Sequence, residues 1–216
     1  MFQGNWGDGI NIALGQYNQV ADNTIYGNGG NGVQLDKASF NRVELNFIEW
    51  NRLAGVFIQT FTSSFANANR VGGNYITGHT YPGIVVTATG VNATATGNDL
   101  SANNISGNRD RSATTQPIGI DLGGTNEPVV YSAGWAPTLT NITSRGDGIN
   151  PNDQNDSDGG PNRLQNYPDL TSAVWSNNFV YVVGKLKGVT GRVYELSFYS
   201  DRQFPEACSG TKPTEG

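Results

Sequence analysis

The feature that most constrains this chain is a repeat that runs from residue 9 to about residue 124. Each copy opens with Gly and then two apolar residues that flank one variable residue. These openings begin at Gly9, Gly32, Gly55, Gly83 and Gly119, which are 23, 23, 28 and 36 residues apart. The first four copies continue with Asn-x-apolar-x-x-Asn-x-Ile-x-x-Asn, in which His79 once replaces the last Asn. A repeat of this length with loops at fixed points predicts a solenoid.

The spacing of the apolar residues predicts which solenoid forms. Apolar residues alternate in each opening, as in Val33 and Leu35, and this period of two indicates a strand. The Asn segments step in fives, which is too short for helices, so each step predicts a short strand with one inward apolar residue and a corner at the Asn. Three such sides close a coil. Coils stacked about 4.8 Å apart pair each strand in parallel with the strand of the next coil.

The residues at the corners predict how the coils are held together. The Asn amides can donate and accept hydrogen bonds along the stack, and we expect each Asn to adopt the left-handed backbone of its corner. We expect the Gly before each opening strand to relieve the same strain. His79 lies at a corner, where it substitutes for Asn in this ladder rather than acting as a general base. The outward positions of the opening strands form a mixed column that suggests no role: Asn11, Gln34, Phe57, Val85 and Asp121.

This pattern resembles the right-handed parallel β-helix proteins of the pectin-lyase-like superfamily, which includes pectate lyases, polygalacturonases and many bacterial surface proteins. The resemblance covers residues 1 to about 124. The order of residues 119–124, the acidic segment and residues 160–168 is similar to uncharacterised bacterial cell-surface β-helix proteins. It implies a secreted or cell-surface location in a bacterium. No signal peptide or cap for the first coil is visible, so we expect this chain to be a fragment of a longer protein.

The expected fold class is all-β, with three parts. Residues 1–124 form a β-helix of about five coils, and residues 125–168 form a linker with an acidic loop. Residues 169–216 form a partial antiparallel β-sandwich, with strands expected at residues 179–186 and 192–199 on the basis of their alternating pattern.

Composition excludes several classes of partner. Charged residues make up only 14% of the chain, the net charge is −5 and the pI is about 4.7, so no basic stripe is available for nucleic acid. A single Cys provides no disulfide framework within the chain. No segment is long and apolar enough to span a membrane. Open ends of a β-helix leave strand edges unpaired, so self-association through these ends is a further expectation.

The acidic segment, residues 152–162, is the strongest local signal for a metal. Ca²⁺ takes about 6–8 oxygen ligands on flexible loops, and carboxylates this close repel one another unless they are neutralised. A solvated turn stabilised by Asx turns explains the same residues without a metal. The candidate ligands of a structural Ca²⁺ are Asn152, Asp153, Asp156, Asp158 and Asn162.

A catalytic site finds less support. Glycoside hydrolysis needs two carboxyl groups on neighbouring coils, but Asp36, Glu44 and Glu49 each lack an acidic partner in their own column. The signatures of polygalacturonases and alginate epimerases are absent. Arg42, Arg70 and Asp99 share an outward column, and the resemblance implies an Arg base with Ca²⁺ held by Asp residues in lyases. A solvent-facing ion pair between Arg70 and Asp99 explains the same column.

Aromatic residues suggest a binding surface. Phe47 and Tyr75 share an outward column on the third side, with Tyr26 and Trp50 close by, and such rings can pack against the C–H faces of sugars unless a loop covers them. The first hypothesis is therefore a non-catalytic module, adhesin-like or polysaccharide-binding, of a bacterial secreted or cell-surface protein. The second is a polysaccharide lyase or glycoside hydrolase acting on an anionic glycan through Arg42, Arg70 and Asp99. A spacer without a ligand is the third.

Overall fold

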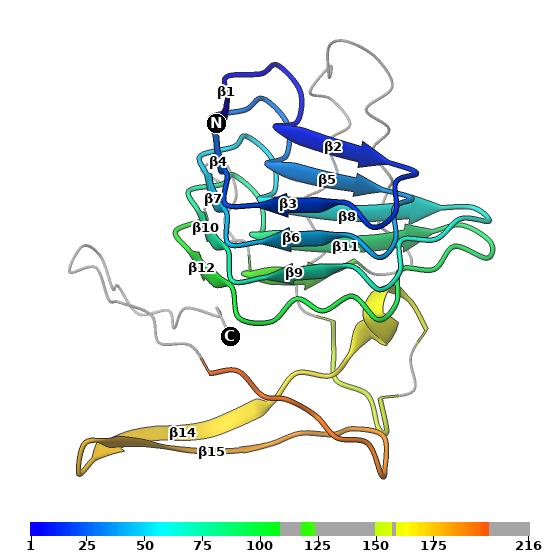
Figure 1. The fold of residues 1–216 in the computed structure, drawn as a ribbon. Helices are drawn as coiled ribbons and strands as arrows, with labels where there is room; N and C mark the ends of the chain where they lie inside the picture. Colours follow the sequence, from blue (N-terminus) through cyan, green and yellow to red (C-terminus); the bar gives the residue numbers. More distant parts are fainter. Residues whose placement is uncertain (109–117, 124–149, 157–158, 199–216) are drawn as a thin grey trace.

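The computed structural model describes residues 1–108, 118–123, 150–156 and 159–198, and within them it consists of strands and one short 3-10 helix. Three parallel sheets form the three sides of a stack of coils (Figure 1). The first side contains β2 (Ile10–Ala13), β5 (Val33–Asp36), β8 (Val56–Phe61), β11 (Ile84–Thr89) and β13 (Ile120–Leu122). The second contains β3 (Gln19–Ala21), β6 (Arg42–Glu44) and β9 (Arg70–Gly72). The third contains β1 (Phe2–Gln3), β4 (Thr24–Tyr26), β7 (Phe47–Glu49), β10 (Tyr75–Thr77) and β12 (Asn104–Ser106).

The pairing register is the one that the repeat predicts. Val33 pairs with Val56 on the first side, and Ile48 pairs with Ile76 on the third. The inward apolar residues, one on each short side, are buried between the three sheets in the first three coils, and Leu100 and Ile105 of the fourth coil are partly buried. Burying each Val or Ile stabilises the fold by roughly 1.5–3 kcal/mol. The predicted three-sided coil is therefore confirmed.

The corner Asn side chains form ladders that run along the stack. Asn41 donates its backbone N–H and its Nδ2 to the Oδ1 atom of Asn69, at 3.0 and 3.1 Å. Asn46 makes the same two bonds to Asn74 on the second ladder. These amides are buried, so the bonds satisfy polar groups that would otherwise be costly to remove from water.

The prediction that the ladder Asn itself is left-handed is wrong. The residue before it takes that conformation, as at Leu45 (φ 57°) before Asn46 and Trp50 (φ 54°) before Asn51. The Asn backbone N–H is a ladder donor that must face the next coil. The chain therefore completes its turn one residue earlier.

The expected role of the opening glycines is also wrong. A Cβ atom on Gly32 would lie 2.3 Å from Ile48 Cγ2 and 2.6 Å from the carbonyl oxygen of Gly55. A Cβ atom on Gly55 would meet Ile76 in the same way, at 2.4 Å. These glycines do not have positive φ angles. They are required because the inward Ile of the third side fills the space of a side chain.

The C-terminal part is an antiparallel hairpin of β14 (Asp169–Ser176) and β15 (Phe179–Lys185), which Figure 1 shows beyond the end of the stack. Asn177 and Asn178 make its tight turn with positive φ angles, as hairpin turns of this length require. β15 matches the expected strand at residues 179–186. The sequence reading missed β14, and the expected strand at 192–199 is wrong for the described residues 192–198, which have no partner strand.

No helix in the described residues is long and apolar enough to cross a membrane.

Candidate functional site

Four aromatic residues lie on the outer face of the third side, and we call them the third-side patch: Tyr26, Phe47, Trp50 and Tyr75. Phe47, Trp50 and Tyr26 are 57%, 53% and 40% exposed, and Tyr75 is half-buried. The ring centroids of Phe47 and Tyr75 are 6.0 Å apart, with the rings tilted by 51°. The predicted column of Phe47 and Tyr75 therefore exists and is accessible to solvent.

The backbone fixes each ring of the patch. Phe47 opens β7 and Tyr75 opens β10, and the two residues are paired in register. Tyr26 ends β4 opposite Glu49. Trp50 lies at the corner after β7, and its indole covers Gly78, where an added Cβ would come within 2.7 Å of the ring. The patch is thus carried by strands and a packed corner, which restrict the motion of its side chains.

A polar column runs beside the aromatic one. Glu49, Thr77 and Ser106 follow one another on β7, β10 and β12, and each points outward from the third side. Their carboxylate and hydroxyl oxygens can accept hydrogen bonds, and the two hydroxyls can also donate. The third side therefore combines flat apolar rings with hydrogen-bonding groups at fixed spacing.

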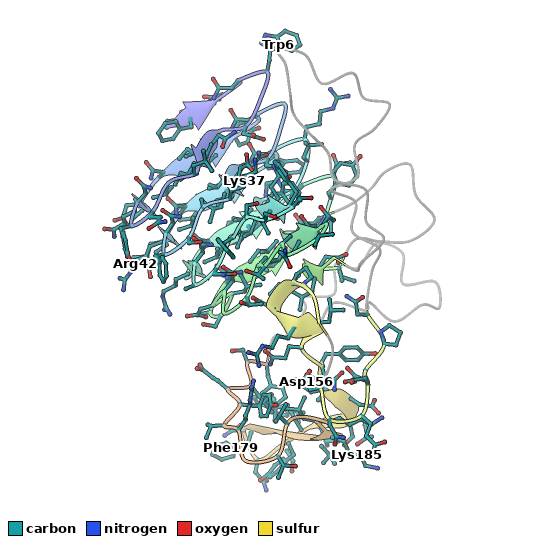
Figure 2. The ribbon with its side chains drawn as sticks, turned by 90° about the vertical axis from the view of Figure 1, so that its right-hand side faces the viewer. Trp6, Lys37, Arg42, Asp156, Phe179 and Lys185 are labelled. Carbon is teal, nitrogen blue, oxygen red and sulfur yellow. The ribbon has the colours of Figure 1, made fainter. Side chains whose placement is uncertain are left out.

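The second side carries a chain of ion pairs. Arg70 Nε lies 2.7 Å from Glu44 Oε1, and Arg70 also pairs with Asp99. Arg42 Nη1 lies 3.7 Å from Glu44 Oε2, and Arg42 points outward from the stack (Figure 2). The predicted Arg70–Asp99 pair is confirmed. The sequence analysis did not predict that Glu44 pairs with these arginines. Arg42 and Glu44 are two residues apart on one strand and so face the same way, which is the signal that could have identified the pair.

These pairs hold the second side in its charged state. Hydrogen bonding to Glu44, followed by the charge of Asp99, raises the pKa of Arg70 above its ordinary value. Burial raises the pKa of Asp99, but hydrogen bonds from Ser101 and the charge of Arg70 outweigh this effect and lower it. Arg70 is therefore protonated and Asp99 ionised at neutral pH. A protonated Arg70 does not suit the role of a base.

The acidic loop uses its oxygens to hold the following segment. Asp156 Oδ1 accepts the backbone N–H of Asn166 at 2.8 Å, and the Asp153 backbone N–H donates to Asn166 Oδ1 at 3.0 Å. Asn152 Oδ1 accepts the N–H of Tyr167. Asp158 lies outside the described residues, and no group of three His, Cys, Asp or Glu residues suited to a metal occurs within them. Ca²⁺ binding stays a prediction.

Asn162 lies apart from the other candidate ligands. It belongs to the 3-10 turn η2 (Pro161–Leu164), its Oδ1 accepts the N–H of Asn98 at 3.0 Å, and its Nδ2 donates to the Asn98 carbonyl at 2.9 Å. Its own backbone N–H donates to Ala95. Asn162 thus adds a rung to the first ladder, from a point 64 residues further along the chain.

His79 replaces one rung of the third ladder, as expected. It is buried, its Nδ1 accepts the N–H of Asn51 at 3.2 Å, and its Nε2 lies 3.0 Å from the carbonyl oxygen of Ile48. Burial lowers the pKa of His79 to about 4. A neutral imidazole therefore takes over both the accepting and the donating roles of the Asn amide.

The outward column of the first side is buried from the second coil onward, although its sequence suggested no role, and only Asn11 of the first coil is exposed. Gln34 and Asp121 are almost fully buried, and Phe57 and Val85 form a second apolar cluster with Ala54. Nearby, burial raises the pKa of Asp36. The alternation of apolar residues along a strand could not reveal this burial, because it predicts which side chains point out of the coil but not whether they are exposed to solvent.

One further aromatic pair was missed. Tyr17 and Phe40 stack with their centroids 5.3 Å apart and their planes 15° from parallel. Both precede the first Asn of consecutive copies, which is the signal that could have identified the pair.

A cavity of about 370 Å³ lies between the fourth coil and η2. It is lined by Ala93, Thr94, Thr96, Asp156, Gly159, Gly160 and Arg163. Figure 2 shows Asp156 between the stack and the hairpin.

Residues 1–100 match the family model described as the right handed beta helix region. Comparison with curated proteins and with solved structures gave no match.

Proposed function

We propose, from the match of residues 1–100 to the model of the right handed beta helix region, that this chain is a non-catalytic polysaccharide-binding module. We further propose that it belongs to a bacterial secreted or cell-surface protein, in an adhesin-like role. The observation that carries the binding proposal is the exposure of the third-side patch on a rigid sheet. Self-association through the ends of the stack remains a separate prediction.

The physical argument begins with the rings. Sugar rings present apolar C–H faces that pack against aromatic surfaces, while their hydroxyls require hydrogen-bonding partners. Phe47 and Tyr75 offer two such surfaces on neighbouring coils, and Thr77 and Ser106 lie in the adjacent column. Rings held by strands lose little conformational entropy on binding, which favours affinity.

The ion pairs of the second side favour binding over catalysis. A lyase base must be deprotonated to accept a proton from the sugar, whereas Arg70 is engaged by two carboxylates and its pKa is raised, which keeps it protonated. The enzyme hypothesis, with Arg42, Arg70 and Asp99, therefore receives no support from the geometry of these residues.

The test is incubation of the protein with a panel of polysaccharides, reading retained protein and newly released chain ends together. We expect retention without release. Phe47→Ala and Trp50→Ala should each weaken retention roughly tenfold or more, because truncating a central aromatic contact commonly costs that much affinity.

Phe65→Ala is the matched control, since Phe65 is 58% exposed, like Phe47, but lies in the loop after β8. It should bind as the wild type does. Release of chain ends that stops in Arg42→Ala would overturn the proposal in favour of the enzyme. Equal retention of the Phe47 and Phe65 variants would show that the third-side patch does not bind the polysaccharide.

A further inference from the structure

The charged residues on the strands of the third side and at the corner that leads into it are acidic. We propose that the patch selects neutral polysaccharides and disfavours polymers rich in carboxylates. This inference rests on the proposed function and adds the chemical class of its ligand.

The outward residues of the third side carry a single charged group, Glu49, within β4, β7, β10 and β12. Glu49 pairs in register with Tyr26 on one neighbouring strand and with Thr77 on the other, so it lies inside the patch. Asp22 is exposed at the corner that leads into this side and lies above Leu45 of the next coil. Both charges at the surface are therefore negative.

The cations of this region lie elsewhere. Arg42 and Arg70 are on the second side and pair with Glu44 and Asp99. Lys37 lies against the ring of Phe61 on the first side. Arg52 follows the corner residue Asn51, and its backbone N–H donates to Asn28, so it begins the next side of the coil. No Lys or Arg occurs among the described residues of the third side.

The chemistry of the ligand follows from these positions. A sugar hydroxyl can donate a hydrogen bond to the carboxylate of Glu49, and a bond to a charged acceptor is stronger than a neutral one. A carboxylate on the sugar would instead bring a second negative charge within several ångströms of Glu49 and Asp22. That repulsion acts only on the acidic polymer, and salt should screen it because the site is exposed.

The experiment compares each neutral polysaccharide that binds with its carboxymethylated derivative of the same length, by calorimetry at low and high salt. We expect the wild type to bind the neutral polymer more tightly, and the difference to shrink at high salt. Glu49→Gln should strengthen binding to the carboxymethylated polymer by roughly fivefold or more. It should weaken binding to the neutral polymer, because the charged acceptor is lost, so that the preference shrinks or reverses.

Asp169→Asn is the matched control, since it also removes one negative charge, from an exposed position on β14 outside the third side. It should leave the preference unchanged. Equal or tighter binding of the carboxymethylated polymer by the wild type, still lost in Phe47→Ala, would overturn the selectivity and leave the proposed function standing. Lack of binding to any polymer in the panel would overturn both.

Discussion

His79 shows how a single residue can fill a ladder position only in one charge state. Neutral imidazole offers Nδ1 to the N–H of Asn51 and Nε2 to the carbonyl oxygen of Ile48. A proton on Nδ1 would face that N–H. Burial disfavours the charged ring as well, which lowers the pKa of His79 to about 4.

This shift predicts an acid-dependent loss of stability. The unfolded chain takes up a proton near the ordinary pKa of about 6.5, before the folded chain does. The contribution of His79 is therefore fully present above pH 6.5, declines as the pH falls towards 4 and changes no further below it, with a total loss of about 3 kcal/mol.

His79→Asn should restore an Asn rung and remove this loss. Urea unfolding at pH 7, 5.5 and 4 measures the difference between the two proteins, in which the contributions of their shared carboxyl groups cancel. Parallel pH profiles for the two would show that His79 is not protonated preferentially in the unfolded chain.

The opening glycines predict a second effect at the residue scale. Gly55→Ala places a Cβ atom 2.4 Å from Ile76 Cγ2 and 2.6 Å from the carbonyl oxygen of Gly83, so the coil must shift. We expect it to lower the free energy of unfolding by about 1–3 kcal/mol. Gly7→Ala, which meets no atom within 4 Å, should change it by less than about 0.5 kcal/mol. Thermal unfolding of both variants makes the comparison, and equal midpoints would contradict the packing argument.

At the scale of elements, the ladders connect each coil to the next, and η2 continues one of them. Asn18, Asn41, Asn69 and Asn98 donate in turn to the next coil, and the last of these donates to Asn162. The turn that carries Asn162 thus satisfies backbone groups of the fourth coil. This links the stability of that coil to the segment that precedes the hairpin.

Asn162→Gly tests this link without straining the backbone, since Asn162 has a φ of 44°. Losing both bonds to Asn98 should cost about 1–3 kcal/mol and speed hydrogen exchange at the Asn98 N–H. Asn155→Gly, at an exposed position that also has a positive φ, is the control and should leave that exchange unchanged. Equal exchange in the two variants would mean that η2 does not cap the ladder.

At the scale of the whole molecule, Asn166 connects the acidic loop with the part of the chain that follows. Its amide donates to the backbone oxygens of Asp153 and Lys187, and its N–H donates to Asp156. These contacts link Asp153 and Asp156 to Asn166 and Lys187. Ca²⁺ would add to them by neutralising the neighbouring carboxylates.

The calcium prediction is tested by calorimetry in EDTA and in added Ca²⁺. At a hundredfold excess over the dissociation constant, binding should stabilise the folded chain by about 2.7 kcal/mol, which corresponds to several degrees in Tm. Asp153→Asn together with Asp156→Asn should remove the increase. Identical Tm values in EDTA and Ca²⁺ would reject the site.

The sequence by itself determined the coils, the ladders and the aromatic column, because in a solenoid these contacts join residues one repeat apart. Aligning the copies therefore places Val33 beside Val56 on the next coil, and Phe47 beside Tyr75. The tertiary structure alone decided the Glu44–Arg70 pair, the rung at Asn162 and the burial of Phe57. These depend on which way side chains reach across columns and on contacts up to 64 residues apart, which no repeat length specifies.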